Sequence, residues 1–261
     1  MVRQGSLTLG RKFLVHNDAL ILESRITSEH WWFAGRRHLF QRIIRQLNLA
    51  PESDIIDLGS GSGSNLEMLR QINFHNVQGL DISPTAVNLC HKKGFKKVVL
   101  GDICQTGFQS ERFDLALATD VLEHVDDDEL ALREIARLLK KDQVALLVVP
   151  SFPSLWGIQD EISAHRRRYR RGELAEKARA AGLSVERHRY FNFLLCVPIW
   201  MARTVLNRVS FGVKNENEVN TPFLNLLFKI IFFCDIYITE LVKVNFGVSE
   251  YILAYKRSEN A

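Results

Sequence analysis

Cysteine, proline and glycine are all scarce in this chain of 261 residues. Its six prolines and 15 glycines are too few for a fibrous or low-complexity protein. The four cysteines lie far apart without CxxC spacing, which argues against a disulfide scaffold and a thiolate zinc site. We therefore expect a globular protein with four reduced thiols, Cys90, Cys104, Cys196 and Cys234.

We expect neither a secretory leader nor a membrane-spanning helix. The apolar residues 13–22 are interrupted by His16, Asn17 and Asp18. No run reaches the roughly 18–20 uncharged apolar residues of a membrane-spanning helix. The net charge of +4 permits acidic partners but does not require nucleic acid. We expect a cytoplasmic protein of one or two domains with no specific nucleic-acid partner.

The middle of the chain alternates between short apolar runs and amphipathic segments. Such alternation predicts strand–helix–strand units, and hence an α/β fold with a doubly wound, mostly parallel sheet. Ser83 followed by Pro84 is typical of a helix start. The predicted strands are 54–58, 77–80, 97–100, 113–118 and 143–149, and the predicted helices are 64–71, 84–93 and 128–140.

The outer parts of the chain add four more elements. An amphipathic helix is predicted over 29–47, and another over 171–181, with Gly182 as its stop signal. Strands are predicted over 183–190 and 248–255. These elements divide the chain into an N-terminal helical cap (1–49), a core (50–190), a hydrophobic helical insertion (191–245) and a last strand with its tail (246–261).

The strongest local motif is a glycine-rich loop that follows a buried strand and precedes a helix. It reads Asp57-x-Gly59-x-Gly61-x-Gly63. Glycines allow positive φ and let backbone N–H groups approach a ligand closely. The dinucleotide pattern GxGxxG fails here, because the third glycine would fall on Ser64 or on residue 66. A nicotinamide-dependent oxidoreductase is therefore a distant alternative.

Two further carboxylates follow the next two predicted strands. Asp81 comes after the second strand, about 20 residues beyond the loop, where a carboxylate can accept both hydroxyls of a ribose. Asp102 follows the third strand and can reach an adenine amino group. The carboxyl ends of parallel strands share one edge of a sheet, so both acids are expected beside the glycine loop.

These motifs, together with Phe113-Asp-Leu-Ala-Leu-Ala-Thr-Asp-Val-Leu-Glu-His-Val, resemble the class I S-adenosylmethionine-dependent methyltransferases over residues 50–190. The resemblance implies a Rossmann-like fold whose last strand is antiparallel to the others. It also implies S-adenosylmethionine as cofactor and S-adenosylhomocysteine as product. It also implies a set of cofactor contacts: Asp57, Gly59, Ser60, Gly61, Gly63, Asp81, Ile82, Asp102, Ile103, Thr119 and Asp120.

The acceptor side is expected just after the fourth predicted strand, at Asp120, Glu123 and His124. We predict His124 and Glu123 as catalytic residues, with His124 as a general base for a hydroxyl acceptor. The three residues also resemble the acid-acid-His cluster of ubiquinone-pathway O-methyltransferases, which can hold a divalent metal. The first acid here is Asp instead of Glu, and no metal site is assigned. A structural, hydrogen-bonding role for the pair is the third interpretation.

The segment His165-Arg-Arg-Arg-Tyr169-Arg-Arg places five arginines around one tyrosine. A solvated face and an anionic acceptor held by arginine are both open interpretations. The pattern resembles a bacterial subgroup of these methyltransferases that has an H-x-R-R-Y loop and an aromatic, basic segment near its start, often associated with cell-surface glycan or lipid pathways. That resemblance implies substrate contacts, with core packing as the alternative for the aromatics: Trp32, Arg36, His165, Arg168 and Tyr169.

The insertion 191–245 is rich in phenylalanine and has helical apolar patterns over 193–209 and 223–243. Three interpretations remain open: a helical pair packed on the sheet edge, a lid or dimer contact, and a peripheral contact with a membrane. The predicted function is O-methylation of a small or a lipid- or glycan-linked acceptor. The alternative is a non-catalytic module that binds S-adenosylmethionine as a sensor or partner.

Overall fold

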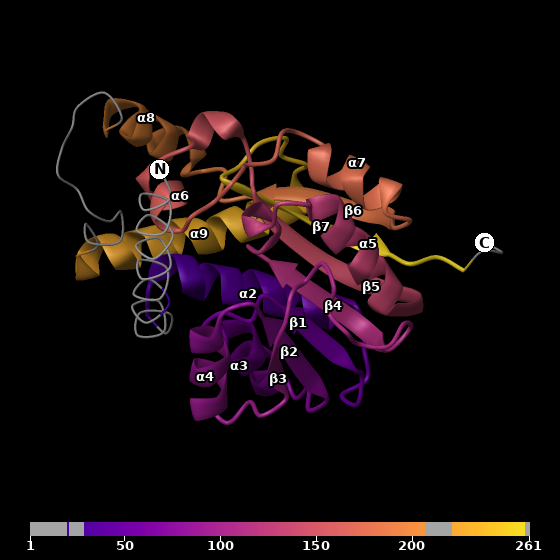
Figure 1. Ribbon diagram of the computed structural model, residues 1–261. Helices are drawn as coiled ribbons and strands as arrows, with labels where there is room; N and C mark the ends of the chain where they lie inside the picture. Colours follow the sequence, from indigo (N-terminus) through magenta and orange to yellow (C-terminus); the bar gives the residue numbers. More distant parts are fainter. Residues whose placement is uncertain (1–19, 21–28, 207–220, 259–261) are drawn as a thin grey trace, which may run out of the picture.

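The computed structural model describes residue 20 and residues 29–206 and 221–258. Its centre is a seven-stranded sheet of order β3-β2-β1-β4-β5-β7-β6 (Figure 1). β7 is antiparallel to both of its neighbours, and the other paired strands are parallel. The predicted Rossmann-like sheet is confirmed. The strands are β1 (Ile55–Leu58), β2 (Val77–Asp81), β3 (Val98–Leu100), β4 (Phe113–Thr119), β5 (Leu139–Pro150), β6 (Ser184–Phe191) and β7 (Ser249–Tyr255).

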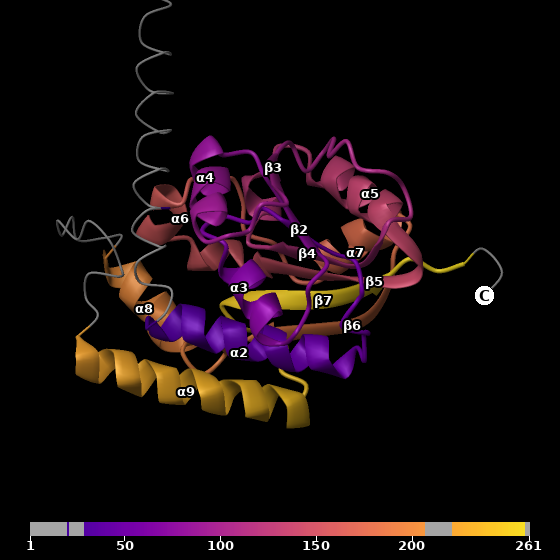
Figure 2. The ribbon, with the colours of Figure 1, turned by 90° about the horizontal axis from the view of Figure 1, so that it is seen from below.

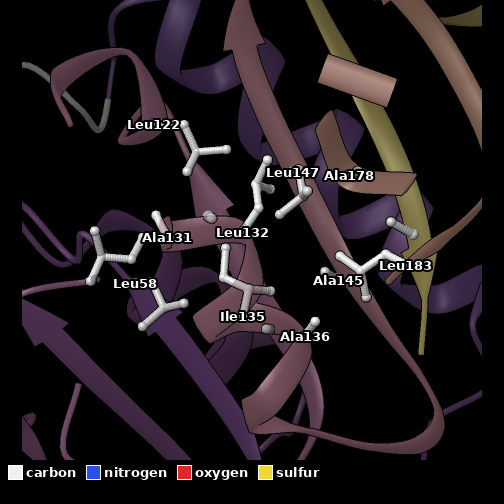
Figure 3. Packing of buried hydrophobic residues seen from close by; sticks show 14 of the residues in the cluster. Leu58, Leu122, Ala131, Leu132, Ile135, Ala136, Ala145, Leu147, Ala178 and Leu183 are labelled. Atoms are coloured by element: carbon white, nitrogen blue, oxygen red, sulfur yellow. The ribbon is translucent and has the colours of Figure 1, made fainter. Parts of the chain in front are cut away.

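Helices cover both faces of the sheet (Figure 2). In β4, Leu115 and Leu117 pack toward α2, α3 and α9, whereas Ala116 and Ala118 pack toward α5 and α7. Figure 3 shows the second of these clusters, with Leu132 of α5, Leu147 of β5 and Ala178 of α7 among its members. Burial on both faces explains why the central strands are apolar at nearly every position. The helices are α2 (Trp31–Gln46), α3 (Ser64–Gln71), α4 (Pro84–Lys92), α5 (Asp128–Leu138), α6 (Ile158–Ile162), α7 (Glu173–Ala180), α8 (Cys196–Leu206) and α9 (Pro222–Leu241), with short 3₁₀ turns η1 (Leu122–His124) and η2 (Pro153–Leu155).

Helix starts follow the side chains that cap them. Ser83 accepts a hydrogen bond from the Ala86 amide, with Pro84 in the first turn, so this predicted start of α4 is confirmed. The His30 ring accepts from the Trp32 amide and caps α2, whose predicted range of 29–47 was slightly too long. The part of the predicted cap at 1–19 and 21–28 lies outside the described residues.

The boundary between α5 and β5 differs from the prediction. A helix was expected over 128–140 and a strand over 143–149, but α5 ends at Leu138 and β5 begins at once with Leu139. Leu139 is fully buried and pairs with Phe113 of β4. Long-range strand pairing and burial therefore outweigh the local helix preference of Lys140 and Lys141.

The insertion connects β6 to β7 and contributes α8 and α9. The end of the first predicted helical pattern, at 207–209, lies outside the described residues. α9 lies along α2 at the base of the molecule (Figure 2). The Phe232 ring packs between Trp32 and Phe191, and the buried Asp235 accepts hydrogen bonds from the amides of Asn192 and Leu194. α9 carries Lys229, Asp235 and Glu240 and so is not an uncharged run, but it is long and apolar enough to cross a membrane by length and composition alone.

Candidate active site

A cavity of about 630 Å³ opens where the carboxyl ends of β1, β2, β3, β4 and β5 meet. In open α/β sheets this edge is the usual ligand crevice, because the chain diverges there to helices on opposite faces. α2 supplies one wall through Trp32, Phe33 and Arg36, and α8 contributes Ile199 and Arg203. The cavity thus lies between the sheet, the cap helix and the insertion.

The glycine-rich loop forms the floor of the cofactor half of the cavity. Gly59, Gly61 and Gly63 all have positive φ, at +78°, +50° and +84°. A Cβ on Gly59 would lie 2.6 Å from a methyl group of Val121, so a larger residue fits neither the backbone nor the space. Gly59, Ser60 and Gly61 line the cavity, whereas Gly63 caps α3 beneath it.

Asp57 supports this loop from behind and does not line the cavity. Its Oδ1 accepts a hydrogen bond from the Asn65 amide (2.9 Å), and the same amide reaches Thr119 Oγ1 (2.9 Å). Burial raises the pKa of Asp57 to about 7, against the opposing hydrogen bonds from Asn65 and Ser60. The sequence analysis missed Asn65, whose only signal was its place beside the loop.

Asp81 and Asp102 stand at the ends of β2 and β3 and line the cavity. The Asp81 carboxylate accepts hydrogen bonds from the amides of Gly61 and Ser83, each 2.8 Å long. These bonds fix its orientation, and a carboxylate has capacity for further donors such as ribose hydroxyls. Ile82 is 70% exposed despite its size and offers an apolar surface in the same half, beside Ile103.

Asp120 forms an ion pair with Arg36 at the wall of the cavity. Asp120 has a positive φ of +51°, an uncommon conformation for this residue type that turns its side chain toward α2. The Arg36 guanidinium also lies over the ring of Phe40, 5.2 Å from its centroid. Asp120, predicted to contact the cofactor, and Arg36, predicted to contact the substrate, are therefore partners of each other. Their ion pair links the end of β4 to α2.

The acceptor half contains Glu123 and His124 from η1 together with His165 from the loop after α6. The rings of His124 and His165 lie edge to face, with centroids 4.8 Å apart, and both line the cavity. Glu123 is fully buried behind them, and its Oε1 lies 3.9 Å from His165 Nε2. Burial, and then the charge of Asp120, raise the pKa of Glu123 well above its usual range.

Asp160 is the acceptor-side residue that the sequence analysis missed. It is fully buried and accepts hydrogen bonds from His165 Nδ1 and Arg168 Nε, both 2.8 Å long. These bonds outweigh the opposing effect of burial and lower the pKa of Asp160. The sequence signal that could have identified Asp160 is its spacing, five residues before His165 and eight before Arg168. Arg168 thus lines the cavity, but its guanidinium is engaged by Asp160 and the Ser151 carbonyl.

Tyr169 does not reach the cavity, contrary to its predicted substrate contact. Its ring is fully buried, and its hydroxyl donates to Asp128 (2.7 Å). Trp32 does line the cavity, although it also stacks on Phe232 with centroids 5.5 Å apart. Three of the five arginines in this segment, for which anion binding was one of two open interpretations, form ion pairs within the chain: Arg166 with Asp126, Arg167 with Asp128 and Arg168 with Asp160.

Comparison with known proteins agrees with this site. Residues 56–147 match the family model described as a methyltransferase domain. The match and the strand order identify this part of the chain as a class I S-adenosylmethionine-dependent methyltransferase domain. Among solved structures, the methyltransferase bound to the Haloferax volcanii Trm112 activator is similar over 94% of this chain and 98% of its own, with a TM-score of 0.63 and 18% identity.

Two curated relatives are similar over part of their length. The ubiquinone biosynthesis O-methyltransferase of Bradyrhizobium diazoefficiens is 31% identical over 121 residues, which are 45% of this chain and 47% of that protein. The chloroplastic 2-methyl-6-phytyl-1,4-hydroquinone methyltransferase of Arabidopsis thaliana is 29% identical over 110 residues, 41% of this chain and 32% of that protein. The chain thus matches less than half the length of each.

Proposed function

We propose that this protein transfers a methyl group from S-adenosylmethionine to an oxygen of a small acceptor or of a lipid- or glycan-linked one. The observation that carries the proposal is a single cavity that joins the glycine-rich loop, Asp81 and Asp102 to His124 and His165. The glycine-rich loop, Asp81 and Asp102 suit a nucleoside. The imidazoles of His124 and His165 lie where an acceptor would meet the methyl group.

The cofactor residues present fit S-adenosylmethionine. Asp81 would accept the ribose hydroxyls, Asp102 the adenine amino group, and Ile82 would contact the adenine ring. The N–H groups of the loop around Gly61 would lie beneath the methionine part. The cofactor supplies an electrophilic methyl group on a sulfonium, and the chain supplies its alignment with the acceptor.

The chemistry requires an in-line displacement. The carbon–sulfur bond breaks as the carbon–oxygen bond forms, and sulfur keeps the electron pair, so that neutral S-adenosylhomocysteine leaves. The hydroxyl proton passes to an imidazole. His124 remains the predicted base, but His165 is the better held candidate, because Asp160 holds its Nδ1 and leaves Nε2 of this cavity-lining ring to accept a proton.

The exposed face of α9 supports a lipid-linked acceptor. It also supports a location of this protein in the cytoplasm, at the surface of a membrane. Large apolar side chains recur there at helical spacing, and the charged residues of α9 lie off this stripe. Asp235 is buried and Glu240 pairs with Arg42. An apolar stripe of this kind suits the bilayer interface. Its members are Phe223, Leu226, Leu227, Ile230, Tyr237, Ile238 and Leu241.

Calorimetric titration with S-adenosylhomocysteine tests the cofactor site directly. We expect binding by the wild type, at least about tenfold weakening in Asp81→Asn from the loss of charged acceptors, and no change in the exposed control Asp142→Asn. Transfer of a labelled methyl group from S-adenosylmethionine to lipid and to water-soluble cell extracts then separates the two functions. Tight binding without transfer to either extract would favour a non-catalytic sensor.

Co-sedimentation with vesicles tests the membrane contact. With anionic phosphatidylglycerol vesicles we expect the wild type to sediment, and Phe223→Asp with Ile230→Asp to remain in solution. Leu130→Asp, at an exposed apolar site on α5, is the matched control and should sediment like the wild type. Equal sedimentation of all three proteins would refute a contact through α9.

A further inference from the structure

We propose that Glu123, His124 and His165 bind a divalent cation of the zinc type at the acceptor end of the cavity. We call these three residues the cation cluster. Each offers one ligand atom, and these atoms all lie within 4.8 Å of one another. The cluster joins two segments that are far apart in sequence, the turn η1 after β4 and the loop between α6 and α7.

Glu123 is the first reason to place a cation here. Its carboxylate is fully buried, and neither oxygen has a hydrogen-bond partner among the described residues. A buried carboxylate without a partner is costly, whereas a coordinated cation would satisfy both its charge and its lone pairs. The His165 ring lies beside this carboxylate, with Nε2 at 3.9 Å from Oε1, beyond hydrogen-bond distance.

The orientation of His165 is the second, independent reason. Its Nδ1 lies 2.8 Å from Oδ1 of the buried Asp160, so that Nδ1 carries the proton and Nε2 presents its lone pair toward Glu123. Metal-binding histidines commonly have this carboxylate partner, which fixes the tautomer and makes the imidazole more basic. Arg168 Nε and the Gly157 amide hold Asp160 in turn.

Two imidazoles and one carboxylate favour zinc or a similar transition metal over magnesium or calcium, which prefer oxygen ligands. Ligands at about 2.1 Å from such an ion lie roughly 3–3.5 Å apart, so the side chains would close by about 1 Å. Asp120 is not part of the set, because it pairs with Arg36. The cluster therefore differs from the Asp120, Glu123 and His124 set considered from the sequence.

The cation would have a defined role in the proposed methyl transfer, and this step depends on that function. His124 and His165 line the cavity, so a coordination position opposite the three ligands would face the acceptor. There the ion would act as a Lewis acid and lower the pKa of an acceptor hydroxyl. The imidazoles would then serve as ligands, and the hydroxyl proton would be released to water instead of to His124 or His165.

Titration with zinc alone tests the site without any acceptor. The full chain, carrying no polyhistidine tag and stripped with chelator, is titrated with Zn²⁺ by calorimetry and with Co²⁺ by absorption. We expect one ion per chain, with nitrogen and oxygen ligation. Glu123→Gln and His165→Gln should each weaken binding by more than about tenfold, and Asp160→Asn by about 10- to 100-fold. The exposed His75→Gln is the matched control and should bind as the wild type does.

Three results would overturn the site: no binding by the wild type, equal binding by Glu123→Gln, or the thiolate bands of Co²⁺ bound to cysteine. Unfolding curves show whether each variant is folded; Glu123→Gln should be at least as stable as the metal-free wild type, because it removes a buried acid. Each protein is also titrated with S-adenosylhomocysteine. Binding of that ligand by a wild type that does not bind zinc would reject the cation cluster while leaving the proposed function intact.

Discussion

The substitution Asp57→Asn should make the protein less sensitive to pH. Asp57 is fully buried behind the glycine-rich loop, and burial raises its pKa to about 7 in the folded state. In the unfolded chain an aspartate titrates near 3.9. Between these values the folded state holds a proton that the unfolded state has lost, so rising pH destabilises the wild type. Asparagine keeps the shape and the contact with Asn65 but cannot titrate.

The size of the effect follows from the two pKa values. A single group of this kind changes the free energy of unfolding by about 1.4 kcal/mol per pH unit within the window. Allowing for partial ionisation at its upper end, we expect about 2 kcal/mol between pH 5 and pH 7. The Asn variant should therefore gain about 2 kcal/mol relative to the wild type over this range, whatever its stability at pH 5.

Urea unfolding followed by tryptophan fluorescence measures this difference. Both proteins are unfolded without cofactor at pH 5 and at pH 7, and the variant-minus-wild-type difference is compared between the two pH values. The other carboxyls with a raised pKa, Glu123, Asp235 and Glu250, titrate in both proteins, so their contributions largely cancel. A difference that stays constant from pH 5 to pH 7 would refute the raised pKa of Asp57.

Four further substitutions test the glycine-rich loop, the packing of α9 and a buried ion pair. Gly59→Ala should lower the free energy of unfolding by about 2 kcal/mol, and Gly94→Ala should lower it by less. Both glycines have positive φ, but of the two only Gly59 lacks space for a Cβ. Equal losses of stability in thermal melts would contradict this. Phe232→Ala should cost about 4 kcal/mol by urea unfolding, since its ring is fully buried, and a loss below 1 kcal/mol would mean that α9 repacks. Lys177→Met should cost about 2 kcal/mol at pH 7. Burial raises the pKa of Asp128, but hydrogen bonds from Lys177 and Tyr169 outweigh it and lower this pKa. The cost should therefore be full above about pH 4 and decline as the pH falls below that value, and a cost independent of pH would argue against the pair.

The fold could be predicted because its signals are local. The period of the apolar residues, the glycine-rich loop and the acids at strand ends all lie within short segments, and the sheet brings Asp81 and Asp102 to one cavity as expected. The α5–β5 boundary could not be predicted in this way. Leu139 joins the sheet because its partner is Phe113, and no local pattern reports a pairing across 26 positions.

The acceptor side was harder to predict because its residues serve one another. Asp160 acts through His165 and Arg168, and Asp120 neutralises Arg36, so two arginines that looked available for a ligand, Arg36 and Arg168, have partners inside the chain. Tyr169 sits in a motif with His165 but points away from it into the core. A sequence motif gives residue types and spacing, whereas the direction of each side chain depends on the loop that carries it.

The position of β7 between β5 and β6 has a consequence for the order of assembly. β6 pairs with β7 alone, yet β7 is the last strand to be synthesised, some 58 residues after β6. During translation β6 and the insertion must therefore wait beside an incomplete sheet, with the edge of β5 also unpaired. Completion of the sheet depends on Ser249–Tyr255, so a chain that stops before Ser249 would leave the edges of both β5 and β6 without their shared partner.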